Sequence, residues 1–65
     1  MKILVNGAWH ELQAAQLAAA LSELGYTGQT VSTAVNGEFV AVAARERAAL
    51  SDGDRVEVLA PMQGG

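Results

Sequence analysis

Two Asn-Gly dipeptides limit what this chain can fold into, because each stands between two short segments of extended pattern. Asn-Gly is a strong short-range signal for a β-hairpin, since both residues tolerate the positive φ angles of its tight turn. Asn6-Gly7 separates a strand predicted at 2–6 from one predicted at 8–12. Asn36-Gly37 marks another tight turn, between a strand predicted at 30–35 and a short one at 39–42. The sequence therefore predicts a chain built largely from short strands.

A helix is predicted between these two pairs of strands, over residues 13–24. Leu17, Leu21 and Leu24 repeat at the spacing of one helical face, and the alanines around them are strong helix formers. Gly25 follows directly and can take the left-handed conformation that closes a helix. No Ser, Thr, Asp or Asn precedes the helix, so the sequence does not identify an N-cap.

The last strand is predicted at 55–59, after a brief helical turn at 43–50 and turn residues at 51–54. Pro61 ends this strand, since proline cannot donate a hydrogen bond to a ladder. The order of elements is hairpin, helix, strand, short strand and strand, which predicts an α+β domain whose helix covers one face of the sheet. The predicted core is Ile3, Val5, Leu17, Leu21, Leu24, Val31, Val56 and Val58.

Composition limits the chain to one small domain and excludes several classes of function. Its 65 residues can form one thin core but hardly a deep substrate pocket as well. The net charge is -3 and the 4 basic residues are scattered, so neither nucleic acid nor a membrane is an expected partner. No cysteine is present, which excludes thiolate metal sites and cysteine nucleophiles. With a single histidine as well, we do not expect an enzyme with catalytic residues of its own.

The apolar run near the start covers only Ile3, Leu4 and Val5. A signal peptide or a spanning helix needs a longer apolar stretch, so we expect a cytoplasmic protein. His10 has no second metal ligand nearby, and Asp52 and Asp54 lack the other oxygen ligands of a calcium loop. We therefore expect no metal site and no bound cofactor.

The segment 61–65, Pro-Met-Gln-Gly-Gly, directly follows the last predicted strand. Five extended residues reach roughly 17 Å, enough to thread into the active site of another protein. Glycine suits such a tail because it has no Cβ and allows close approach of the backbone to a ligand. We expect the tail to be mobile in the free protein, as a glycine-rich terminus has little to hold it. The alternative interpretation is that residues 61–65 have no function.

The terminal carboxylate of Gly65 is the group on which this tail could perform chemistry. Its pKa is ordinarily about 3.3–3.7, so it is ionised at neutral pH and is a poor electrophile. Transfer to ATP would give an acyl-adenylate, from which a sulfur nucleophile could displace AMP and leave a thiocarboxylate.

Apolar residues on the far side of the predicted sheet are candidates for partner docking. Alternation places Leu4 and Leu59 opposite the core residues, on a face that is usually polar in a small sheet. Met62 and Phe39 are the other candidate docking residues. Scattered surface apolar residues are the alternative interpretation. Trp9 is expected to serve in packing rather than as a binding platform.

Over nearly its whole length the chain resembles the thiamine-biosynthesis sulfur carrier proteins, the ThiS family. The segments that carry the resemblance are 1–7, the helix with Leu17, Leu21 and Leu24, 34–40, 50–58 and the closing Gly64-Gly65. The resemblance implies a ubiquitin-like β-grasp fold over residues 1–60, with a mixed sheet of four or five strands and one main helix on one face.

The resemblance also implies a set of partners. An E1-like adenylyltransferase would use ATP to adenylate Gly65, and a sulfur donor protein would supply the sulfur for the thiocarboxylate. Thiazole synthase would receive that sulfur, while Gly64 and Gln63 thread the tail into the partner's site. We expect the free protein to be a monomer.

The sequence departs from the family pattern at two places. Ala41-Val42 stand where many relatives carry Pro-Arg, near the expected docking side, and no Ser or Thr stands near the helix start. Two other functions stay open. The small subunit of molybdopterin synthase shares the fold and the Gly-Gly end but is usually longer. A non-covalent β-grasp binding module would act through its sheet face and would not need the tail.

Overall fold

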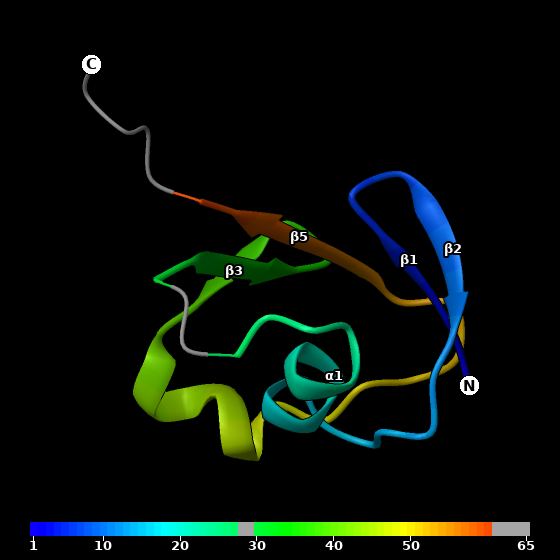
Figure 1. Cartoon of the computed structure of the whole chain (residues 1–65), viewed down its shortest axis with the longest axis horizontal. Coiled ribbons are helices and arrows are strands. Elements are labelled where there is room, and N and C mark those ends of the chain that lie inside the picture. The colour runs from blue at the N-terminus through cyan, green and yellow to red at the C-terminus, as the bar shows by residue number, and fades with distance from the viewer. Residues whose placement is uncertain (28–29, 61–65) are drawn as a thin grey trace.

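The computed structural model describes residues 1–27 and 30–60, which form a five-stranded sheet with a helix on one face (Figure 1). The sheet order is β2-β1-β5-β3-β4, with β1 and β5 parallel and the other neighbouring pairs antiparallel. The predicted α+β architecture with a mixed sheet is therefore confirmed. Its elements are β1 (Lys2–Val5), β2 (Ala8–Glu11), α1 (Leu17–Glu23), β3 (Ser32–Val35), β4 (Glu38–Val40), the 3-10 helix η1 (Val42–Arg47) and β5 (Arg55–Leu59).

Both Asn-Gly dipeptides close β-hairpins, as their sequence predicts. Asn6 and Gly7 have φ angles of 47° and 84° and join β1 to β2. Asn36 and Gly37 have φ angles of 50° and 84° and join β3 to β4. Two consecutive positive φ angles are typical of the type I′ turn, whose twist matches that of the flanking strands. The two hairpins therefore share one turn geometry.

The side chain of Asn6 also attaches the first hairpin to β5. Its Oδ1 accepts a hydrogen bond from the Val58 backbone N–H at 2.8 Å, and its Nδ2 donates to the Val58 carbonyl at 3.0 Å. The paired positions of β1 and β5 are Leu4 with Arg55 and Val5 with Val56. The Asn6 amide thus continues the connection between the two strands beyond the backbone pairing, toward the C-terminal end of β5.

Asn36 makes the corresponding attachment from the second hairpin. Its Oδ1 accepts from the Arg55 backbone N–H at 3.0 Å, and its Nδ2 donates to Oδ1 of Asp54 at 3.1 Å. Its own backbone N–H donates to the Arg55 carbonyl at 2.7 Å. The start of β5 is therefore held by one turn asparagine and its C-terminal half by the other.

The helix α1 is shorter than the predicted 13–24, because it begins at Leu17 and ends at Glu23. Gln16 is its N-cap, and Oε1 of Gln16 accepts from the Ala19 N–H at 3.0 Å. Glutamine is not among the preferred N-cap residues, so its role could not be seen in the sequence.

Tertiary pairing explains why residues before Gln16 are not helical. The Ala15 carbonyl accepts from the Leu50 N–H at 3.0 Å, and the Leu17 N–H donates to the Ala48 carbonyl at 2.9 Å. The chain therefore pairs here with the segment 48–50 in an antiparallel bridge. The Glu23 carboxylate further accepts from the backbone N–H groups of residues 13 and 14 at 2.9 to 3.0 Å. These long-range bonds outweigh the helix propensity of the local alanines.

The C-terminal end of α1 follows the prediction. Gly25 has a φ angle of 94°, the left-handed conformation expected of a residue just after a helix. The Tyr26 N–H donates to the Leu21 carbonyl at 2.9 Å, and the Gly25 N–H donates to the Ser22 carbonyl at 3.1 Å. These two bonds form a Schellman motif, which satisfies carbonyls that the helix leaves free.

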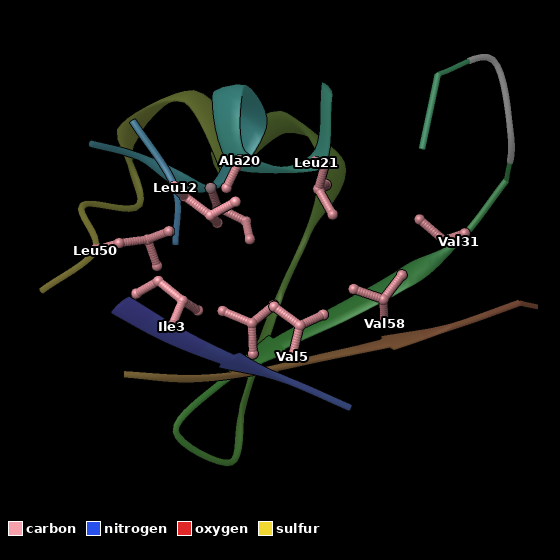
Figure 2. Packing of buried hydrophobic residues seen from close by; sticks show 10 residues of the cluster. Ile3, Val5, Leu12, Ala20, Leu21, Val31, Leu50 and Val58 are labelled. Carbon is pink, nitrogen blue, oxygen red and sulfur yellow. The ribbon is translucent and has the colours of Figure 1, made fainter. Parts of the chain in front are cut away.

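The core lies between the sheet and α1. Figure 2 shows Ile3, Val5 and Val58 pointing from the strands toward Ala20 and Leu21 of the helix. The predicted core residues are buried, except for Leu24, which is only partly buried. The structure adds to them Leu12, Ala20 and Leu50.

One buried polar residue ties η1 to the sheet. Thr33 is 1% exposed, and its hydroxyl donates to the Val40 carbonyl at 2.8 Å and accepts from Nε of Arg45 at 3.1 Å. Nη2 of Arg45 donates to the Val31 carbonyl at 2.6 Å. The helix η1 lies beside α1 on the same side of the sheet (Figure 1). The opposite face of the sheet is therefore the one that no helix of the described residues covers.

Replacing Asn6 by glycine tests its attachment to β5. Glycine tolerates the positive φ angle but removes both hydrogen bonds to Val58 and leaves the Val58 backbone groups without that partner. We expect the free energy of unfolding, measured by urea denaturation, to fall by about 1–3 kcal/mol. Asn36→Gly is the matched control, and its loss should be smaller because its bonds are exposed to water. An equal or larger loss for Asn36→Gly would contradict this assignment.

Candidate functional site

The uncovered face of the sheet carries exposed apolar side chains, which we call the outer face. Alternate residues of a strand point to opposite faces, so the residues between the buried ones belong to it. Its apolar members are Leu4, Trp9, Ala34, Phe39 and Leu59. This alternation confirms that Leu4 and Leu59 lie opposite the core, as predicted.

Exposure differs among the candidate docking residues. Phe39 is 72% exposed and Leu59 65%, which are large fractions for such apolar side chains. Leu4 is half-buried, and Trp9, its cross-strand neighbour on β2, is 56% exposed. Solvated faces of small sheets are usually polar, so an apolar surface of this kind is typical of an interaction site.

Charged groups lie among these apolar side chains. Arg55 and Glu57 alternate with buried valines on β5, and Nε of Arg55 lies 3.7 Å from Oε1 of Glu57. At the other end of the face, the Lys2 ammonium lies 5.8 Å from the centroid of the Trp9 ring. Exposed ion pairs contribute little stability, so these charges affect the character of the surface more than the stability of the fold.

The outer face extends to the end of β5, the strand that precedes residues 61–65 in the sequence. This strand is the central one of the sheet, and Leu59, its last residue, pairs with Ser32 of β3. On the other side Asn6 holds Val58 through both backbone groups. The chain that leads to the tail is therefore anchored from both sides up to its last residues before the tail.

The other predicted site residues belong to the tail. Pro61, Met62, Gln63, Gly64 and Gly65 lie outside the described residues. The expected mobility of the tail, its threading and the chemistry of its carboxylate therefore stay predictions.

The acidic turn residues have the structural role that the sequence indicates. Oδ1 of Asp52 accepts from the Lys2 N–H at 2.7 Å, and Oδ2 of Asp54 accepts from the Ser51 N–H at 2.8 Å. His10 is exposed on β2. Within residues 1–27 and 30–60, no group of three or more His, Cys, Asp or Glu side chains could hold a metal ion. In that same part of the chain, no helix is long and apolar enough to cross a membrane.

Trp9 is the outer-face residue that sequence reasoning missed. The expectation that it serves mainly in packing is wrong, because it is 56% exposed and lies outside the core. The sequence feature that could have placed Trp9 on this face is the two-residue turn at Asn6-Gly7, because a turn of that length fixes the register of the hairpin. In that register Trp9 lies directly opposite Leu4 and must share its face.

Two solved structures are similar to this chain over its full length. One is the crystal structure of the thiamine biosynthesis protein (ThiS) from Geobacter metallireducens, with 33% sequence identity and a TM-score of 0.80, where each chain is covered to 100%. The other is the solution structure of a thiamine biosynthesis protein from the same organism, with 32% identity and a TM-score of 0.78. There the match covers 100% of this chain and 88% of the other.

The remaining comparisons concern sequence alone. No curated protein matches the chain closely enough to add to the argument. A family model described as the ThiS family matches residues 3–65, which is nearly the whole sequence. Together with the full-length structural likeness, which confirms the β-grasp fold, this match shows that the chain belongs to the ThiS family.

Proposed function

We propose that this protein is a sulfur carrier in thiamine biosynthesis and that Gly65 holds the sulfur as a C-terminal thiocarboxylate. The observation that carries the proposal is the family match, which extends to the last residue and so includes Gly64 and Gly65. The two similar structures are described as thiamine biosynthesis proteins, which supports the pathway. In this proposal the chain is a protein co-substrate for its partner enzymes and not an enzyme itself.

The proposed chemistry has two steps on the Gly65 carboxylate. A carboxylate oxygen attacks the α-phosphorus of ATP in the site of an E1-like adenylyltransferase, and pyrophosphate leaves. Sulfur at the oxidation level of hydrogen sulfide, released by a sulfur donor protein, then attacks the acyl carbon, and AMP leaves with the electron pair of the broken bond. The resulting thiocarboxylate delivers its sulfur to thiazole synthase. Gly64 and Gln63 provide the narrow chain that reaches into each site, since glycine allows close approach.

The outer face is the proposed docking surface for these partners. Phe39 and Leu59 have the largest exposed fractions among the apolar side chains of this face, and Leu4 continues the surface toward β2. Met62 follows Leu59 closely in sequence and is the fourth proposed docking residue. A partner that covers this face would hold the end of β5, and with it the start of the tail, at a fixed distance from its own active site. Such positioning raises the effective concentration of the carboxylate at the reacting centre.

Intact mass tests the carrier function. The protein is incubated with an E1-like adenylyltransferase of a thiamine pathway, ATP and a sulfur source. We expect the mass gain of one oxygen replaced by one sulfur, and we expect that gain to disappear when Gly65 is deleted. Transfer to thiazole synthase but not to molybdopterin synthase would assign the pathway.

A control carrier of known activity shows that the adenylating enzyme works in this assay. If the control gains sulfur and this protein does not, the carrier proposal is wrong. The non-covalent binding module would then be the remaining interpretation, and removal of 61–65 should leave partner binding unchanged.

Leu59→Asp tests docking through the outer face. The charge would be buried without a partner in the complex, so we expect the affinity for the adenylyltransferase, measured by titration calorimetry, to fall about tenfold or more. Ala19→Asp is the matched control, because Ala19 is exposed but belongs to α1, which covers the other face of the sheet. Equal losses for the two variants, both folded by circular dichroism, would argue against this surface.

A further inference from the structure

The two Asn-Gly turns are also dipeptides that can react with themselves. The backbone nitrogen of the glycine attacks Cγ of the asparagine, a ring closes through the new N–C bond, and the Cγ–Nδ2 bond breaks to release ammonia. Water then opens the ring, which leaves either aspartate or its β-linked isomer in place of asparagine. Glycine favours the attack because it has no Cβ to obstruct the approach.

This chain contains a natural comparison of two such sites. Asn6-Gly7 and Asn36-Gly37 form the same kind of turn, with φ angles of 47° and 84° in the first and 50° and 84° in the second. Local sequence and backbone geometry are therefore nearly equal. Any difference in reactivity between the turns must come from their surroundings.

The amide of Asn6 is held by the backbone of the central strand. Both of its hydrogen bonds go to Val58, at 2.8 Å and 3.0 Å, and both are partly buried. The amide of Asn36 is bonded to the Arg55 N–H and to the Asp54 carboxylate, and both of these bonds are exposed to water. An amide must leave its partners before the glycine nitrogen can reach Cγ. Water can replace the partners of Asn36 more easily than those of Asn6.

A positive charge distinguishes the second turn further. Nη2 of Arg55 lies 3.6 Å from the position that a Cβ of Gly37 would occupy, whereas no atom lies within 4 Å of that position at Gly7. A guanidinium beside the glycine stabilises both its deprotonated nitrogen and the oxyanion that forms during the attack.

Two carboxylates near the second turn reduce the effect of this guanidinium. Glu57 pairs with Arg55 at 3.7 Å, and Asp54 faces the amide nitrogen of Asn36 that leaves. We therefore expect Arg55 to change the rate by a small factor.

We propose that Asn36-Gly37 is a site of spontaneous deamidation in the folded protein, promoted by Arg55, and that Val58 protects the identical dipeptide Asn6-Gly7. The aspartate product at position 36 would face the Asp54 carboxylate without the amide donor between them. The β-linked product would also lengthen the turn. Either product would weaken the attachment of the second hairpin to the start of β5.

Peptide mapping of the folded protein, incubated in mildly alkaline buffer, tests the proposal. Mass spectrometry with separation of the two isomers follows the loss of each asparagine. We expect Asn36 to react about tenfold faster than Asn6. This ratio corresponds to a modest difference between the two sites in the free energy needed to break the hydrogen bonds of the side-chain amide. The two rates should approach each other in concentrated urea. Equal rates in the folded protein, or no reaction at Asn36 there, would overturn the proposal.

The role of Arg55 is tested within the same molecule. Arg55→Gln should slow the reaction at Asn36 about threefold and leave the rate at Asn6 unchanged. A factor of this size corresponds to the free energy of an interaction between exposed charges. Arg55→Lys keeps the charge and should retain most of the rate. If Arg55→Gln, shown to be folded by its urea unfolding curve, reacts at Asn36 as fast as the unmodified protein, Arg55 does not promote the reaction.

Discussion

The position of β5 between β1 and β3 determines how the rest of the structure holds together. Neither hairpin contacts the other through backbone pairing, because β5 separates them in the sheet order. Each turn asparagine attaches its own hairpin to β5, Asn6 at Val58 and Asn36 at Arg55. The strand that leads to the Gly-Gly end is thus also the strand that unites the sheet. Mechanical support for the tail and stability of the domain depend on the same hydrogen bonds.

Local patterns in the sequence predicted most of the elements but not their pairing. The Asn-Gly dipeptides gave both hairpins, and alternation around Val56 and Val58 gave β5 with its bounds. These features depend on backbone preferences of neighbouring residues, which is why they can be recognised in the sequence. The parallel contact of β1 with β5 joins residues far apart in the chain. The sequence did not predict this pairing, since the resemblance to a family implied only a mixed sheet.

The start of α1 shows why the remainder could not be predicted. Residues 13–16 have the composition of a helix, yet the bridge between Gln16 and Ala49 keeps the chain extended there. Leu50, which directly follows this bridge in the chain, and Leu12 are two core residues that the predicted list lacked. The other strand ends shifted by one or two residues, as in β3, which begins at Ser32 rather than at the predicted 30. Partners from distant segments decide such boundaries.

Local patterns likewise predicted the positions of the sheet residues in the candidate site but not the chemistry of the tail. Alternation placed Leu4 and Leu59 on the outer face, and the register of the first hairpin adds Trp9 to them. Phe39 follows from the second hairpin in the same way. The chemistry of Gly65 was inferred from the tail sequence and the family resemblance. It remains the part of the function that the proposed experiments must establish.

The central place of β5 has a consequence for biosynthesis. A ribosome releases the chain from its N-terminus, so both hairpins and α1 emerge before residues 55–59. Until β5 arrives, each hairpin is a two-stranded ribbon with both edges open, and such ribbons are only marginally stable in water. Cooperative folding must therefore wait until β5 is available. Before that, the open strand edges of the two hairpins in a nascent chain can pair with strands of other molecules.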